Sequence, residues 1–159
     1  KLETIMNQRA KIIDEHNCRS VKNYNSRYDK KMTYIIYVLD ELPQVTHDKE
    51  CSDRLKLIMQ KCRSYGIYFI LATQDATKDT IGKCKMNCSQ TVGFRTRDTT
   101  DSKTLINNEI LETIRVRGRC FIDNSEGMEE TQIFYVSEEQ IEDLLKDRLK
   151  EKYKPVEVE

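Results

Sequence analysis

The chain has 159 residues, of which 38% are hydrophobic, so it is long enough to bury the core of one domain without disulfide bonds. Its 27 basic and 27 acidic residues cancel, and with only two prolines and five glycines it is neither collagen-like nor of low complexity. No apolar run approaches the roughly 18 residues that cross a bilayer and no signal pattern opens the chain, so we expect a soluble piece. In the absence of a secretion signal or a second metal-binding knuckle, the six cysteines are expected to be thiols rather than disulfides or zinc ligands.

The first part of the chain predicts a helix, a loop and a strand. Apolar residues at helical spacing predict an amphipathic helix over residues 2–16. The polar stretch of residues 18–31 predicts a loop with one short turn or helix. Residues 33–39 then form a continuous apolar, β-rich run, which is typical of a strand buried on both faces.

The next segment predicts a strand crossover. Residues 53–65 carry apolar side chains at helical spacing, with Ser52 as the expected N-cap and Gly66 as the expected stop. Residues 67–73 form a second apolar run. A strand, a helix and a second strand in this order predict a βαβ unit, and hence an α/β fold with a mainly parallel sheet flanked by helices.

The rest of the chain predicts shorter elements. Three short strands are expected at residues 91–96, 119–122 and 131–136, and helical patches at residues 75–88 and 102–114. The segment Ser137-Glu-Glu-Gln140 is a capping box, which predicts a terminal helix running to about Tyr153. We expect residues 154–159 to form a flexible tail.

Two acidic residues, Asp40 and Glu41, directly follow the first apolar strand. Ligands bind beyond the carboxyl ends of the strands in open parallel sheets. An apolar strand followed by Asp-Glu is the Walker B pattern of nucleoside triphosphatases, in which one carboxylate holds the Mg²⁺ shell and the other polarises the attacking water. The alternative is an unrelated strand that ends in two solvated acids.

The second apolar run ends in Thr73 and Gln74, one crossover away. If the two strands are parallel, this amide reaches the same edge of the sheet as Asp40 and Glu41. A polar amide there can sense a γ-phosphate or orient water. The alternative is a plain strand terminus.

Five segments in order resemble the FtsK/SpoIIIE family of DNA-pumping ATPases. They lie in residues 17–25, 34–41, 57–74, 92–105 and 117–121, so the resemblance covers nearly the whole chain. It implies a RecA-like P-loop NTPase core in residues 1–153. It further implies an ATP-driven motor that translocates double-stranded DNA, in chromosome segregation or conjugative transfer, as a homo-hexameric ring.

The same resemblance implies roles for individual residues. Asp40 is expected to hold Mg²⁺ through water, Glu41 to be the catalytic base and Gln74 to be the sensor of the bound ATP. The parent protein is expected to be bacterial and anchored to the membrane through a region outside this chain, with this part in the cytoplasm.

Basic residues form a second, weaker set of candidates. Lys103, Arg95, Arg97, Arg117 and Arg119 are candidates for contacts with nucleotide, phosphate or DNA, and Arg115 alternates with the last two. The alternative for the alternating arginines is a solvated strand edge that prevents aggregation. Lys103 stands where the family has Arg, and Arg117-Gly-Arg-Cys120 stands where the family has Gly-x-Gly-Asp, which indicates a divergent member.

No Gly-x-x-x-x-Gly-Lys-Ser/Thr phosphate loop occurs in the chain. Because the chain also begins with Lys, we interpret it as the later part of the motor domain. We expect the missing phosphate-loop strand to lie between the two long strands, and we expect no tight ATP binding or hydrolysis by this piece alone. Two other hypotheses stay open: the ATPase domain of a type VII protein-secretion system, and a degenerate, non-catalytic interaction module.

Overall fold

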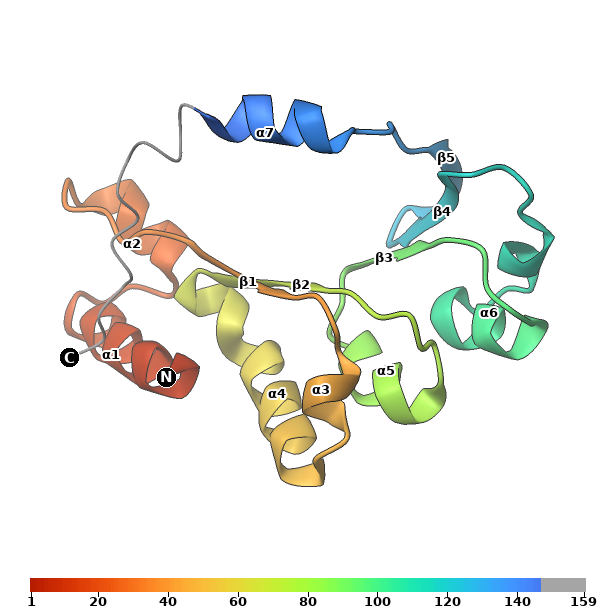
Figure 1. The fold of residues 1–159 in the computed structure, drawn as a ribbon. Helices are drawn as coiled ribbons and strands as arrows, with labels where there is room; N and C mark the ends of the chain where they lie inside the picture. Colours follow the sequence, from red (N-terminus) through yellow and green to blue (C-terminus); the bar gives the residue numbers. More distant parts are fainter. Residues whose placement is uncertain (147–159) are drawn as a thin grey trace.

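Two parallel strands, β1 (Ile35–Leu39) and β2 (Ile67–Leu71), pair in register along their whole length. The structure is a computed structural model that describes residues 1–146. The chain between the strands forms the short helix α3 (Pro43–Thr46), helix α4 (Lys49–Lys61) and a 3-10 turn (Cys62–Tyr65). The predicted βαβ crossover is therefore confirmed (Figure 1).

Direct pairing of β1 and β2 corrects one expectation. Ile35 lies opposite Ile67 and Leu39 lies opposite Leu71, so no strand separates the two. The prediction that a missing phosphate-loop strand lies between the two long strands was wrong, because a five-residue ladder in register leaves no room for it.

The ends of α4 show which local signals were read correctly. The side chain of Asp48 accepts a hydrogen bond from the backbone N–H of Cys51, so Asp48 is the N-cap. The predicted N-cap, Ser52, was wrong: it lies inside the helix and is buried. At the other end Gly66 has φ +68°, the left-handed conformation that glycine adopts without strain, which confirms the predicted stop.

Helices α1 (Leu2–Glu15) and α2 (Val21–Arg27) precede the first strand, as the sequence predicts. Arg9 links α1 to the two segments that lead into β1 and β2. Its guanidinium donates hydrogen bonds to the carbonyl oxygens of Tyr65, at 2.6 Å, and Thr33, at 2.8 Å. Burial lowers the pKa of Arg9, which still leaves this side chain charged at neutral pH.

A second sheet is antiparallel. Its strands are β3 (Gln90–Gly93), β4 (Arg119–Asn124) and β5 (Gly127–Gln132), in the order β3-β4-β5. The expectation of a mainly parallel sheet therefore holds for β1 and β2, whereas the shorter strands pair with each other in the opposite sense.

The last strand begins earlier in the sequence than predicted. A two-residue link after Asn124 closes a tight hairpin, in which the Asn124 side chain accepts a hydrogen bond from the backbone N–H of Glu126. β5 therefore occupies residues 127–132 rather than 131–136. Most of its residues are polar and exposed, among them Glu129 and Glu130, so the strand has no apolar run by which the sequence could predict it.

The remaining helices are α5 (Lys78–Lys85), α6 (Thr99–Ile106), a 3-10 turn (Ile110–Thr113) and α7 (Glu138–Lys146). The capping box at α7 is confirmed, because Gln140 N–H donates to the Ser137 hydroxyl and Ser137 N–H donates to the Gln140 side chain. The predicted continuation of this helix to about Tyr153 and the tail of residues 154–159 lie outside the described residues. Among residues 1–146 no helix is long and apolar enough to span a membrane.

The parallel sheet is buried on one face. In Figure 1, α3, α4 and α5 lie on one side of β1 and β2. On the opposite face Ile36 and Val38 expose 63% and 62% of their surface, and Ile70 of β2 exposes 54%. The prediction of strands buried on both faces was therefore wrong for this chain.

Candidate functional site

Asp40 and Glu41 follow β1 in a short segment whose two ends, Leu39 and Leu42, are both hydrogen-bonded to Ala72, the residue after β2. The backbone N–H of Ala72 donates to the carbonyl oxygen of Leu39 at 2.8 Å, and the backbone N–H of Leu42 donates to the carbonyl oxygen of Ala72 at 3.0 Å. Asp40 and Glu41 lie between these two bonds. Their backbone is thus fixed beside the end of β2 while both side chains stay exposed to solvent.

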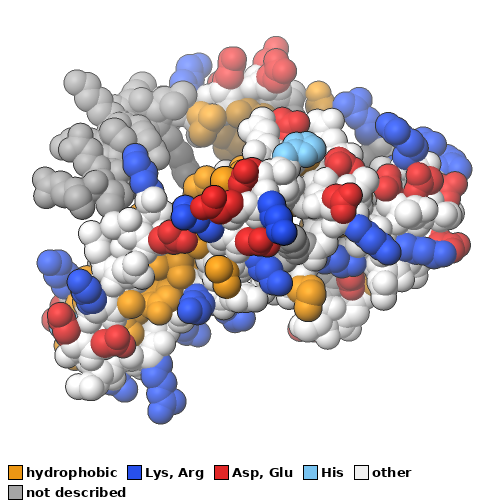
Figure 2. Space-filling model, turned by 90° about the horizontal axis from the view of Figure 1, so that it is seen from below, with side chains coloured by type: hydrophobic (Ala, Val, Ile, Leu, Met, Phe, Trp, Pro, Cys, Tyr) orange, Lys and Arg blue, Asp and Glu red, His pale blue; other side chains and the backbone are white. Residues whose placement is uncertain are grey.

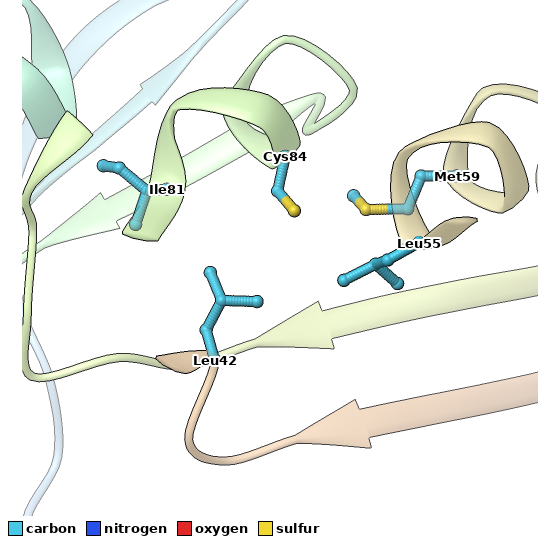
Figure 3. Close-up of a cluster of buried hydrophobic side chains, with 5 residues drawn as sticks. All are labelled: Leu42, Leu55, Met59, Ile81 and Cys84. Atoms are coloured by element: carbon cyan, nitrogen blue, oxygen red, sulfur yellow. The ribbon is translucent and has the colours of Figure 1, made fainter. Parts of the chain in front are cut away.

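The buried side chain of Leu42 anchors this segment to the helices that cover the sheet. This side chain is 2% exposed and packs in a hydrophobic cluster with Leu55 and Met59 of α4 and with Ile81 and Cys84 of α5. Figure 3 shows the side chain of Leu42, just beyond the end of the strands, pointing into the space between the two helices. The cluster therefore fixes the carboxyl ends of the two strands against the helices.

Glu41 makes a hydrogen bond that orients it. Its Oε2 accepts a hydrogen bond of 2.9 Å from Nε2 of Gln44, one turn later in the chain. The other carboxylate oxygen, Oε1, is available in this geometry to accept a proton or a water molecule. An exposed, singly hydrogen-bonded carboxylate matches the chemistry of a base.

Gln74 lies two residues after Ala72, at the same edge of the sheet, and is exposed. The preceding Thr73 stabilises the turn, since its hydroxyl donates to the Asp75 carbonyl and accepts from the Asp75 backbone N–H, both at 3.0 Å. The structure thus brings Asp40, Glu41 and Gln74 to the ends of two adjacent parallel strands.

Asp75 is an acid at this edge that the sequence analysis missed. Its Oδ2 accepts hydrogen bonds from the hydroxyls of Thr80, at 2.7 Å, and Thr77, at 3.3 Å. The hydrogen bond from Thr80 lowers the pKa of Asp75, and bonds from Thr77 and the nearby His47 act in the same direction. Asp75 therefore fastens the turn after β2 to the start of α5. A pattern of Asp followed by Thr at the second and fifth positions is a signal that could have found it.

This lowered pKa makes stability depend on pH. A carboxylate with a lowered folded-state pKa stabilises the fold above the unfolded-state pKa of about 3.9, and this contribution is lost as the pH falls through the folded-state value. We expect Asp75→Asn to reduce the free energy of unfolding at pH 7 by no more than about 1 kcal/mol, because the site is solvent-accessible. In urea unfolding, the difference from the unmodified chain should shrink as the pH falls below about 4.

Asp29→Asn is a suitable control for this measurement, because Asp29 is an exposed loop acid. It should leave both the stability at pH 7 and its pH dependence unchanged. Equal pH dependence for the Asp75 variant and the unmodified chain would contradict the assignment.

Asp40 fits Mg²⁺ in one arrangement. Mg²⁺ is usually held by one or two carboxylates together with substrate phosphates and water molecules. Within residues 1–146 no group of three or more His, Cys, Asp or Glu side chains is arranged to hold a metal ion. An exposed carboxylate such as Asp40 fits a Mg²⁺ ion whose other ligands are phosphate and water, and not an ion enclosed by protein.

The basic candidates fall into two sets. Lys103 of α6 forms an ion pair with Glu109, and Arg97 is exposed in the loop before α6. By contrast Arg95, Arg117 and Arg119 line one hollow together with Arg115. Of the three alternating arginines, only Arg119 lies within a strand, β4.

The helix-covered side of the molecule carries both signs of charge. Figure 2 shows Lys and Arg side chains beside Asp and Glu side chains over most of the view from below. For the described residues, this face therefore presents a mixed surface and not a continuous basic track.

Comparison with known proteins agrees with this geometry, although no family model matches the chain. The DNA translocase FtsK of Leptospira interrogans is 31% identical to it over 158 residues, which cover 91% of the chain. FtsK translocases are therefore homologues of this chain, at 25–31% identity over most of its length. The match covers only 17% of that FtsK protein's length.

Solved structures share the fold. The pCW3 conjugation coupling protein TcpA, in its monomer form with ATPγS, matches with a TM-score of 0.78 at 21% identity, over 91% of this chain and 46% of that one. The cytoplasmic domain of the type VII secretion ATPase EccC of Thermomonospora curvata matches with a TM-score of 0.73 at 20% identity, over 84% of this chain and 16% of that one. The predicted FtsK/SpoIIIE resemblance and the α/β fold of a P-loop ATPase domain are confirmed.

Proposed function

We propose that this chain is the part of an ATP-driven, double-stranded DNA translocase that carries the acidic half of the nucleotide site. The observation that carries the proposal is the pair of hydrogen bonds that join Leu39 and Leu42 to Ala72, which fixes Asp40 and Glu41 beside the turn that leads to Gln74. Similarity to FtsK supports the motor, and the ATPγS bound to TcpA supports the nucleotide.

In this proposal each residue has a defined task. The exposed carboxylate of Asp40 holds a water molecule of the Mg²⁺ shell, and bound Mg²⁺ neutralises charge on the phosphates of ATP. Glu41, oriented through one oxygen by Gln44, accepts a proton from the attacking water through the other. The amide of Gln74 orients that water or detects the γ-phosphate.

The wider assembly is also part of the proposal. The motor acts as a homo-hexameric ring, contacts DNA through its phosphate backbone without reading bases, and is anchored to the membrane of a bacterial cell with this part in the cytoplasm. The phosphate loop that completes the nucleotide site is supplied by residues upstream of this chain.

A second candidate changes the cargo. The fold shared with EccC supports a protein-secreting ATPase. Lys103 is paired with Glu109, and Arg119 is paired with Glu130, so these two positions are partly neutralised as DNA contacts. These ion pairs are the observation that favours the second candidate. The effect of DNA on ATP turnover decides between the two.

The test is ATP turnover by a polypeptide extended upstream through the phosphate loop, measured with and without double-stranded DNA. Stimulation by the duplex supports the DNA translocase. Turnover that ignores DNA supports the secretion ATPase, and no turnover by a folded protein supports the non-catalytic module.

A further inference from the structure

Four arginines line one open hollow of about 300 Å³. This arginine hollow is formed by Arg95, Arg115, Arg117 and Arg119 together with Phe94 and Val116. Figure 1 places these segments at the end of β3 and the start of β4, away from the end of β1 where Asp40 and Glu41 lie. The hollow is therefore separate from the proposed nucleotide site.

The backbone that presents these arginines is fixed. Gly118 has φ +77°, and a Cβ there would lie 2.8 Å from the side-chain nitrogen of Gln132. That Gln132 nitrogen donates to the carbonyl oxygen of Arg117 at 3.0 Å, and the Ile133 N–H donates to the Gly118 carbonyl at 2.9 Å. The turn between Arg117 and Arg119 thus requires glycine and is fastened to the end of β5.

Contacts within the hollow hold the guanidinium groups in place. Arg115 uses Nη1 to donate to the carbonyl oxygens of Glu112, at 2.6 Å, and Ile114, at 3.2 Å. The Arg117 guanidinium lies 5.9 Å from the centre of the Tyr135 ring. Since a guanidinium has five N–H donors, these contacts leave donors for a ligand.

Arg119 carries an unsatisfied donor. Its Nη1 pairs with a carboxylate oxygen of Glu130 at 3.0 Å, but its Nε is buried and has no hydrogen-bond partner. Buried donors without partners are rare in folded proteins, because such a donor loses its hydration and gains nothing in return. Because Nε is buried, a ligand in the open hollow would be bound by the terminal N–H groups of the Arg119 guanidinium, of which Nη1 already pairs with Glu130.

We propose that the arginine hollow is a binding site for phosphate groups. Planar guanidinium groups match phosphate oxygens in pairs, and several of them around one hollow favour a multiply charged oxyanion. The same phosphate chemistry occurs on the backbone of nucleic acid and on a free nucleotide or pyrophosphate. With duplex DNA as the ligand, this inference rests on the proposed function and names residues of its DNA contact. Binding to the hollow requires neither Asp40 nor ATP hydrolysis, so the two proposals can fail separately.

The test compares two double variants of this chain with the same change in net charge. Arg115→Gln with Arg117→Gln removes two guanidinium groups from the hollow. Arg63→Gln with Arg19→Gln removes two exposed guanidinium groups that do not line it. Circular dichroism checks that both variants keep the fold, which is expected because all four side chains are exposed.

Two probes distinguish the source of the phosphate: a fluorescent DNA duplex, followed by anisotropy over a range of salt concentrations, and inorganic pyrophosphate, followed by calorimetry. The hollow variant is the one that carries Arg115→Gln and Arg117→Gln. We expect it to bind the probe that the unmodified chain binds at least about tenfold more weakly, because each charge-assisted contact contributes about that factor. For the duplex, the slope of log affinity against log salt should fall by about two, since each lost phosphate contact removes about one. The control variant should change affinity less than about twofold and keep the slope.

A loss on the duplex alone assigns the site to the nucleic-acid backbone, and a loss on pyrophosphate assigns it to a free phosphate ligand. Both outcomes support the proposal. Equal losses in the two double variants, or unchanged binding of both probes by the folded hollow variant, would overturn it.

Discussion

Replacing Glu41 by Gln lowers ATP turnover about 10²- to 10⁴-fold in a polypeptide extended upstream through the phosphate loop, which is the range for removal of a general base. Gln keeps the size of the side chain and one oxygen, so the contact with Gln44 is retained in part. It cannot accept a proton from water at neutral pH. The steady-state rate of phosphate release is the measurement, with ATP affinity measured in parallel to show that binding persists.

Glu50→Gln is the matched control, because Glu50 is an exposed acid of α4 whose partner is Arg54 on the same helix. This variant should hydrolyse ATP at the rate of the unmodified protein. If the Glu41 variant kept more than about a tenth of that rate, Glu41 would not be the base. Turnover that is lost in the control as well would indicate a general effect of charge on the fold.

The parallel pair and its crossover helix were predictable because their signals are local. Two apolar runs on either side of an amphipathic helix, with Gly66 at its end, specify a βαβ unit through spacing and backbone preference. The same signals placed Asp40, Glu41 and Gln74 at one edge of the sheet, since the carboxyl ends of parallel strands coincide.

The features that the sequence did not reveal depend on contacts between distant segments. A continuous apolar run does not say whether one or both faces of a strand are covered, and Ile36 and Val38 are exposed although the pattern predicts burial. A two-residue turn between β4 and β5 makes the two strands antiparallel, and β5 is largely polar, so its pattern does not predict a strand. The arginine hollow depends on Gly118 and its neighbour Gln132, which are 14 residues apart in a sequence that shows only alternating arginines.

Leu42→Ala should reduce the free energy of unfolding of the chain by about 2–5 kcal/mol, the usual loss for a buried leucine, which combines lost burial with the cavity that remains. The side chain is 2% exposed and lies among Leu55, Met59, Ile81 and Cys84, from two helices that surround it. Rigid helices on two sides limit how far the site collapses, which favours the upper half of that range. Urea unfolding followed by circular dichroism measures the loss.

Leu57→Ala makes the same chemical change on the outer face of α4, where Leu57 is 58% exposed, and should alter the free energy of unfolding by less than about 0.5 kcal/mol. In the extended polypeptide, Leu42→Ala should also slow ATP turnover at urea concentrations too low to unfold the protein. The buried side chain anchors the residue whose backbone N–H makes one of the two bonds that fix Asp40 and Glu41. A Leu42 variant that is as stable as the Leu57 variant would mean that the cluster does not hold the strand ends. A destabilised Leu42 variant with unchanged turnover would show that the backbone bonds to Ala72 position the acids without help from the core beneath them.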